Sequence, residues 1–211
     1  MVSYETFDRA ALVYQPPTKN PHGGITVWLQ HPNRRFQFPE CEVPFGINAS
    51  EEDPTRKTFA IAVADPALVA WCLEQDACNL QHAVEQSEAW FSKKLTKGVV
   101  ENFYRPLVTV PEKETYSSLL RLKITPQTQF WRLEGETVHR AEESDLTGRC
   151  RLIPVVEPSS LWFVQNSFGM SLKAMHVLIT APGSEGGGAA TEGGDFIFGA
   201  ETDELIMDQS Q

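Results

Sequence analysis

Apolar and polar residues alternate in two separate regions of the chain, and helical spacing occupies the region between them. Ile25, Val27 and Leu29 alternate with Thr26, Trp28 and Gln30, which predicts a half-buried strand with Trp28 on its polar face. Further strand patterns lie at 58–64, 120–124, 129–134, 148–156, 161–165 and 170–180. Short strands around a helical insertion are typical of a small closed or partly open β-barrel. The sequence therefore predicts one mainly β domain spanning residues 25–180.

The helical insertion is expected at about residues 65–105. Asp65 and Pro66 suit a helix start, because the carboxylate can cap free backbone N–H groups and proline fits the first helical position. A second helix is predicted from about Asp76 to Phe91, and Thr96 is a candidate start for a short third one. A turn is predicted at 166–169, between the last two strands.

Both ends of the chain differ from this central domain. Residues 1–24 are polar and interrupted by proline and glycine, and are predicted to form a flexible arm. Residues 181–211 begin as a Gly-rich linker and continue as an acidic segment with apolar clusters. We interpret them as a disordered tail that binds partner proteins through Phe196, Phe198 and Leu205. A merely solubilising tail is the alternative.

The net charge of −10 at first argues against a nucleic-acid ligand, whose binding sites are usually basic. The charge is unevenly distributed, however. Seven of the 28 acidic residues lie in 181–211, which contains no Lys or Arg, so residues 1–180 carry 21 acidic residues against 18 basic ones. The central domain is therefore close to neutral, and a polyanionic ligand is not excluded.

No motif for catalysis, nucleotide phosphates or a metal is found. The chain lacks HExxH, GxSxG, GxGxxG and GxxxxGK[ST] patterns, so we predict a non-enzymatic protein without cofactor or metal. The four cysteines form no CxxC pair and fit small apolar core residues in a reducing compartment. No apolar run is long enough to span a membrane, and the N-terminus lacks the pattern of a secretory signal. An intracellular location is therefore expected.

Cationic and aromatic side chains occur together on the predicted strands. Arg121 and Lys123 share one strand face, and Arg149 and Arg151 are predicted to share another. Trp28 is a candidate to stack on bases, and so are Phe130 and Trp131, which are adjacent to each other in the sequence. A single strand of nucleic acid needs both elements, since cations follow its phosphates and aromatic rings stack on its bases. Core packing and ordinary solvated surface are the alternatives for these residues.

Four blocks of sequence, in this order and spacing, resemble the single-stranded DNA-binding proteins of large nucleocytoplasmic (algal-type) DNA viruses. They are VPFGI (43–47), SEAWFSKKL (87–95), VVENFYRPLV (99–108) and WFVQNSFGMSLKAMHVLI (162–179). The resemblance implies an OB-like β-barrel that coats single strands during replication without catalysis. The acidic end of the chain also looks like the tails of phage single-strand binders, which recruit replication enzymes.

We therefore expect a protein that binds and protects single-stranded DNA in replication or recombination. Phosphates would contact Arg121, Lys123, Arg149 and Arg151, and bases would stack on Trp28, Phe130 and Trp131. Replication proteins would bind the tail, and self-association is open. A structural or virion-associated protein is the alternative function, and an enzyme with a site assembled from distant residues comes third.

Overall fold

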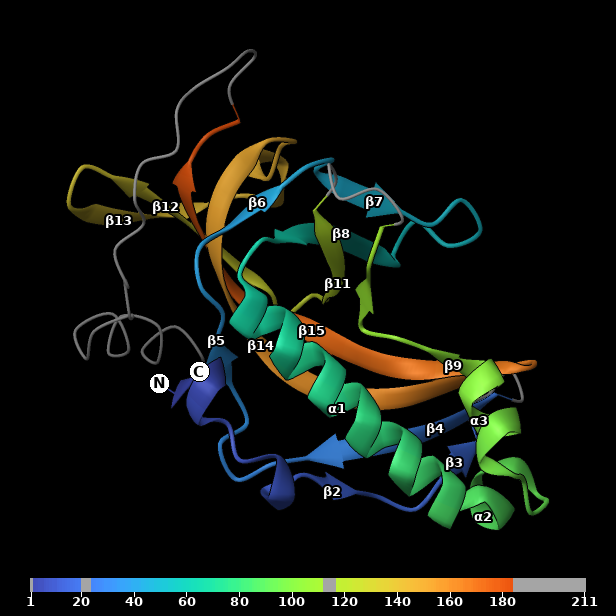
Figure 1. Cartoon of the computed structure of the whole chain (residues 1–211). Coiled ribbons are helices and arrows are strands. Elements are labelled where there is room, and N and C mark those ends of the chain that lie inside the picture. The colour runs from blue at the N-terminus through green and yellow to red at the C-terminus, as the bar shows by residue number, and fades with distance from the viewer. Residues whose placement is uncertain (1, 20–23, 112–116, 184–211) are drawn as a thin grey trace.

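Five strands form a closed barrel in the computed structural model (Figure 1), which describes residues 2–19, 24–111 and 117–183. These strands are β6 (Cys41–Val43), β8 (Lys57–Val63), β11 (Ser118–Ile124), β14 (Cys150–Val164) and β15 (Ser167–Ala181). Around the barrel, β6 pairs with β8, β8 with β11, β11 with β15, β15 with β14, and β14 again with β6. The β11–β15 pair is parallel and the others are antiparallel. This is the arrangement of an OB-type barrel, as predicted.

Shorter strands extend this sheet in the described part of the chain. They are β1 (Val2–Ser3), β2 (Val13–Tyr14), β3 (Thr18–Lys19), β4 (Ile25–Gln30), β5 (Phe36–Gln37), β7 (Ile47–Ala49), β9 (Tyr104–Arg105), β10 (Val108–Thr109), β12 (Gln129–Glu134) and β13 (Thr137–Ala141). The β12–β13 hairpin projects from the barrel (Figure 1) and pairs with the C-terminal half of β15.

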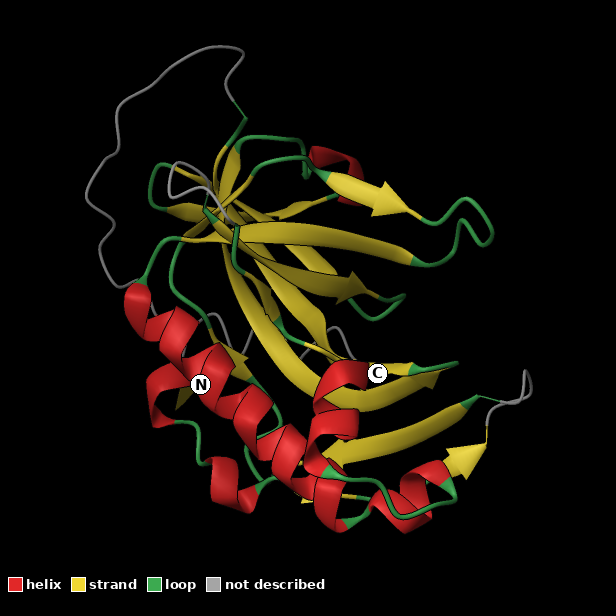
Figure 2. Ribbon diagram, turned by 45° about the vertical axis from the view of Figure 1, so that its right-hand side comes forward, coloured by secondary structure: helices red, strands yellow, loops and turns green. Residues whose placement is uncertain are grey.

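The two longest strands, β14 and β15, continue beyond the barrel as one hairpin. β4 pairs with β14 and β9 pairs with β15, which makes a second sheet layer below the barrel. Figure 2 shows helices gathered on one face of this layer. Val27, Leu161 and Phe168 are fully buried in one hydrophobic core that continues into the barrel. The predicted turn at 166–169 is wrong by two residues: the chain turns at 165–166, and Phe168 belongs to this core.

The helical insertion consists of α1 (Pro66–Glu85), α2 (Ser87–Phe91) and α3 (Lys97–Phe103). The Asp65 carboxylate accepts the Ala67 backbone N–H at 2.9 Å, so α1 begins as predicted. The predicted break near Asp76 is wrong, because α1 continues for 20 residues. Its polar residues at this point face inward, where Gln75, Asp76 and Asn79 are buried.

These buried polar groups are joined by hydrogen bonds. The Tyr104 hydroxyl donates to the Asp76 carboxylate at 2.5 Å, and the Leu107 N–H donates to both oxygens of that carboxylate at 3.0 and 3.2 Å. The Asn79 amide donates to the Tyr104 hydroxyl at 2.9 Å, and its carbonyl accepts the Tyr14 hydroxyl at 2.7 Å. The network therefore connects α1 with the N-terminal segment and with the chain after α3.

Ionisation of Asp76 is expected to lower the unfolding free energy as the pH rises from 4 to 7. Burial raises the pKa of its carboxyl from 3.8 to about 6, although the hydrogen bonds from Tyr104 and Leu107 oppose the shift. The folded chain thus keeps this proton to a higher pH than the unfolded chain. The resulting stabilisation is present below pH 4 and is lost as pH rises through 6. Relative to Asp76→Asn, the wild type should lose up to about 3 kcal/mol of unfolding free energy over this range.

Urea unfolding of both proteins from pH 4 to pH 7 measures this difference. The slope against pH is the relevant quantity, because the variant can also change the absolute stability. Parallel profiles for the two proteins would show that Asp76 has no such role.

The N-terminal segment is not the flexible arm that its composition predicts, since residues 2–19 pack on the domain. Tyr4, Phe7 and Leu12 are buried in the main core. The Tyr4 hydroxyl donates to the Asp65 carboxylate at 2.8 Å. Arg9 pairs with Glu74 of α1 at 3.0 Å. The buried apolar residues of this segment are spaced irregularly among polar ones. They therefore give no periodic pattern from which the packing could be predicted.

The cysteines fit the predicted role of small apolar residues. All four are free, and Cys41, Cys72 and Cys150 are buried. Burial raises the pKa of the Cys41 and Cys72 thiols to about 12 and that of Cys150 to about 11. These three side chains therefore stay as neutral thiols at physiological pH.

Candidate nucleic-acid interface

The face of the strands opposite the helices is polar, cationic and aromatic, and we call it the outer strand face. Alternation defines it, because the intervening residues of β4, β11, β14 and β15 point into the core. Its members are Trp28 on β4, Thr58 on β8, Arg105 on β9, Arg121 and Lys123 on β11, Glu157, Ser160 and Trp162 on β14, and Ser171 and Lys173 on β15.

Strand register places these residues in rows across the sheet. Trp28 is opposite Ser160, which is opposite Ser171. Trp162 is opposite Gly169, whose other neighbour is Arg105 on β9. Trp28 and Trp162 are thus diagonal neighbours on adjacent strands, within the range at which large side chains on one face interact.

The row nearest the barrel is cationic. Lys173 lies between Glu157 on β14 and Lys123 on β11, and Lys123 is opposite Thr58 on β8. Arg121, two residues before Lys123, is exposed on the same face of β11. Three cationic side chains from two neighbouring strands therefore lie close together.

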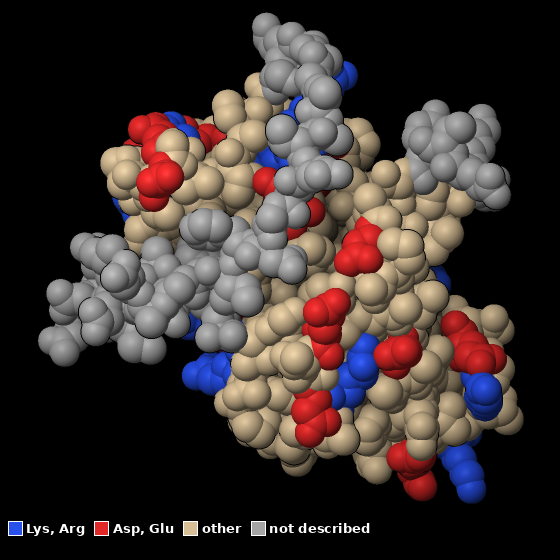
Figure 3. All heavy atoms as spheres, turned by 60° about the vertical axis from the view of Figure 1, so that its left-hand side comes forward, with Lys and Arg blue, Asp and Glu red and all other residues tan. Residues whose placement is uncertain are grey.

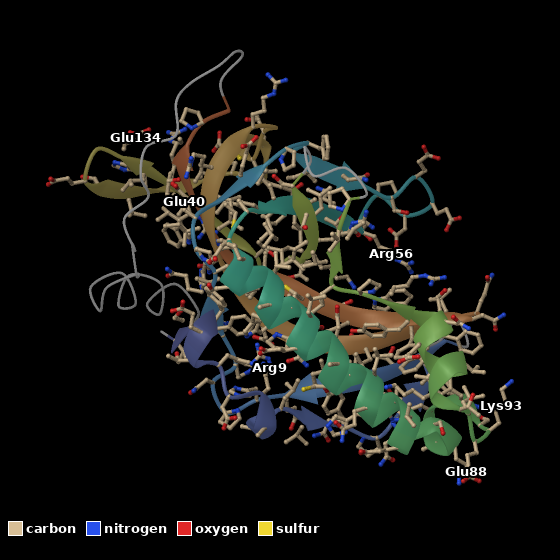
Figure 4. All side chains as sticks on the ribbon, viewed as in Figure 1. Arg9, Glu40, Arg56, Glu88, Lys93 and Glu134 are labelled. Carbon is tan, nitrogen blue, oxygen red and sulfur yellow. The ribbon has the colours of Figure 1, made fainter. Side chains whose placement is uncertain are left out.

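The pKa of Lys123 is lowered, first by burial and then by the nearby charges of Lys173 and Arg56. Arg56 pairs with Asp53 at 3.1 Å, and Figure 4 shows it between β8 and the β9 end of the long hairpin. Within the described residues, no carboxylate lies within 4 Å of the charged nitrogens of Arg121, Lys123 or Lys173. Their mutual repulsion is relieved by any anion that binds between them.

The Trp162 ring lies against Gly169, which has no side chain to displace it. A Cβ at position 169 would lie 2.8 Å from the Arg105 carbonyl oxygen and 3.0 Å from the Trp162 ring. The Trp28 side chain is more open, with 47% of its surface exposed. The two tryptophans therefore provide one fixed and one accessible aromatic surface beside the cations.

The side of the molecule that faces forward in Figure 3 has a different character. Acidic and basic side chains are interspersed on it, without a large area of one sign. The fields of neighbouring opposite charges largely cancel, and salt screens what remains within roughly 8 Å at physiological ionic strength. This side is therefore a weaker candidate for a polyanion than the outer strand face.

Three of the seven residues predicted to contact nucleic acid lie on the outer strand face: Arg121, Lys123 and Trp28. Arg149 and Arg151 do not share a strand face, because Arg149 lies in the turn before β14 with a φ of +64°. Arg151 is paired with Glu40, with 2.9 Å between Nε and Oε2. Both arginines lie near the opposite end of β14.

Phe130 cannot stack on a base, since it is 5% exposed and belongs to the main core; that prediction is wrong. Trp131 is half-buried on β12, and the Arg140 guanidinium lies over its ring at 4.9 Å. It is opposite Leu178 on β15, five residues beyond Lys173. The predicted tail anchors Phe196, Phe198 and Leu205 lie outside the described residues.

Sequence reasoning missed Lys173, Trp162, Arg105 and Arg56. Ser171 and Lys173 alternate with Leu172 and Ala174, so strand periodicity could have identified Lys173. Trp162 stands between apolar residues, and nothing in the sequence separates it from the core. Arg105 and Arg56 lie on a two-residue strand and in a loop, and only the tertiary pairing places them here.

Two properties of the described residues bear on other classes of site. None of the helices among them is both long and apolar enough to cross a membrane. No group of three or more His, Cys, Asp or Glu residues is arranged among them to hold a metal ion.

The fold is similar to that of the single-stranded DNA-binding protein from bacteriophage Enc34, which has been solved in several states. One structure has a TM-score of 0.50 at 10% sequence identity, and the match covers 82% of this chain and 94% of the phage chain. A second, of the phage protein in complex with ssDNA, has a TM-score of 0.48 at 9% identity, with 81% and 97% covered. At these identities the likeness concerns the fold alone.

No curated protein sequence matches the chain. The profile of a family described as "Family of unknown function (DUF5871)" matches residues 46–184. That range contains the helical insertion and four of the five barrel strands. The match extends over more than half of the sequence, so the chain belongs to this family.

Proposed function

We propose that the protein binds single-stranded DNA, without catalysis, along the outer strand face. The observation that carries the proposal is the cluster of Arg121, Lys123 and Lys173 beside two tryptophans on one face of an OB-type barrel. In such barrels, strands two and three and the adjoining loops bind oligonucleotides. Here those strands are β8 and β11, and β11 carries two of the clustered cations.

The two kinds of side chain have separate roles in this proposal. Lysine and arginine neutralise phosphates and release counterions, which gives affinity without sequence preference. Trp28 and Trp162 offer ring faces on which unpaired bases stack. The fold likeness to a phage protein that binds single strands supports the same ligand.

The biological role that we propose is protection of single strands during replication or recombination, inside the cell. Replication proteins would bind the tail, residues 181–211, through Phe196, Phe198 and Leu205. The support is compositional, since residues 181–211 hold seven acidic and no basic residues. An origin in a large DNA virus and self-association stay predictions. The alternative is a structural or virion-associated protein without nucleic-acid binding.

Fluorescence anisotropy with a single-stranded oligonucleotide and its duplex tests the proposal. Stacking requires unpaired bases, so the duplex is expected to bind about tenfold more weakly or worse. The logarithm of single-strand affinity should fall with the logarithm of salt with a slope of about −3, for four or five phosphate contacts. Equal affinity for both DNA forms would contradict the stacking role. Absence of binding at low salt would favour the structural alternative.

A further inference from the structure

A pocket of about 370 Å³ opens where β4 ends beside β14. Its lining consists of Leu29, Gln30, His31, Arg34, Glu157 and Pro158. The volume lies in the range of small-ligand sites. Gln30 follows Trp28 by two residues on the same face of β4, and Glu157 is the strand neighbour of Lys173. The pocket is therefore continuous with the outer strand face.

The Glu157 carboxylate has acceptor capacity left for a ligand. Arg34 Nη2 lies 3.4 Å from Oε1, and Arg35 Nε lies 3.7 Å from Oε2. Charge-assisted hydrogen bonds are typically about 2.7–2.9 Å long, so neither arginine makes a close pair. The two guanidinium groups and the adjacent Lys173 nevertheless surround the carboxylate with positive charge. A DNA strand can therefore approach it despite its own phosphates.

The other lining residues complete a site with donors and apolar surface. The Gln30 side-chain carbonyl accepts from Gln15 at 3.2 Å, which leaves the Gln30 amide N–H groups to donate. The Arg34 side chain is 77% exposed and also has donors to offer. His31 is engaged with the backbone carbonyls of Asp8 and Asn33, each at 2.8 Å. Leu29 and Pro158 supply the apolar part of the wall.

We propose that this pocket takes one unpaired guanine of the bound strand, an inference that rests on the proposed function. Guanine is the DNA base that presents two adjacent N–H donors, at N1 and N2, next to a carbonyl acceptor, O6. The donors match the two oxygens of Glu157, and O6 matches Gln30 or Arg34. Adenine and cytosine each place an acceptor beside a single amino group, and thymine has one N–H between two acceptors. Each would leave a carboxylate oxygen unpaired.

The test compares oligothymidines that carry one central dG, dI, dA or dC, using the full-length wild-type protein. The dG strand should bind about tenfold more tightly than the dA or dC strand. Inosine lacks the N2 amino group, so the dI strand should lie between them. Glu157→Gln should abolish this discrimination, so that the four strands bind equally. The affinity for plain oligothymidine should stay the same or rise, because the substitution removes a negative charge beside Lys173.

Glu88→Gln is the matched control, because it makes the same charge change at an exposed position of α2 (Figure 4), a helix that contributes no residue to the pocket lining. It should retain the preference for dG. Equal affinity for all four strands, with tight binding of each, would overturn the guanine site and leave the proposed function intact. A dG preference that persists in a folded Glu157→Gln variant would overturn the assignment to this pocket. Absence of binding to every strand would overturn both.

Discussion

Replacing Arg121, Lys123 and Lys173 together by glutamine is expected to weaken the proposed binding of single-stranded DNA by on the order of 100-fold at 50 mM salt. Each phosphate contact to a single strand contributes about −0.7 to the slope of log affinity against log salt. The triple variant should therefore flatten that slope by about two. All three side chains lie on the outer strand face, and none is paired with a described carboxylate. Anisotropy titrations at several salt concentrations measure both quantities.

The control for this variant is Lys93→Gln combined with Lys94→Gln and Lys97→Gln. It removes the same charge from three exposed positions. Lys93, which Figure 4 labels, and Lys94 lie between α2 and α3, and Lys97 is the first residue of α3. Its effect on the slope should be small, because these lysines lie away from the outer strand face. If both triple variants lose affinity equally, binding depends on overall charge and not on this face.

Phe168→Ala is expected to destabilise the fold by roughly 3–5 kcal/mol, the usual loss for a buried phenylalanine. The ring is fully buried and stacks on Phe163, with 5.3 Å between centroids. It also meets Phe91 and Tyr104 edge-on at 5.4 and 5.0 Å. These contacts join the long hairpin to the helical insertion, so the cavity would open between them. Urea unfolding at pH 7 measures the loss.

Val164→Ala is the control for that loss, since Val164 lies four residues away and is 59% exposed. It should change stability by less than about 0.5 kcal/mol. A loss below 1 kcal/mol for Phe168→Ala would show that the helical insertion does not depend on this aromatic cluster.

Strand periodicity predicted much of the barrel because one face of each strand is buried. On β4 and β11 the alternation placed Trp28, Arg121 and Lys123 outside, as the structure has them. The method failed where burial is not periodic. Asp76 looked like a helix start because an isolated carboxylate is rarely buried, and its partners on Tyr104 and Leu107 are distant in sequence. The prediction for the N-terminal segment was wrong because its buried residues are also not periodically spaced.

The candidate site could be predicted only in part, because it combines residues from strands that are far apart in the sequence. Lys123 and Lys173 are 50 residues apart, and the parallel β11–β15 pair makes them neighbours. Phe130 and Trp131 are adjacent in sequence, yet one lies in the main core and the other against Arg140. Alternation shows that their environments differ, but it does not show which ring meets solvent.

The barrel is closed between β11 and β15 by the register pair of Lys123 and Lys173, two ammonium groups on the same side of the sheet. Like charges directly opposite each other destabilise a strand pair, so the repulsion between Lys123 and Lys173 weakens this junction when no anion is bound. A phosphate bound there would turn repulsion into attraction on both sides of the junction. A ligand that binds the folded state stabilises it, so an anion bound at this junction is expected to raise the stability of the closed barrel. If the protein binds single-stranded DNA as proposed, the bound strand would therefore also stabilise the closed barrel.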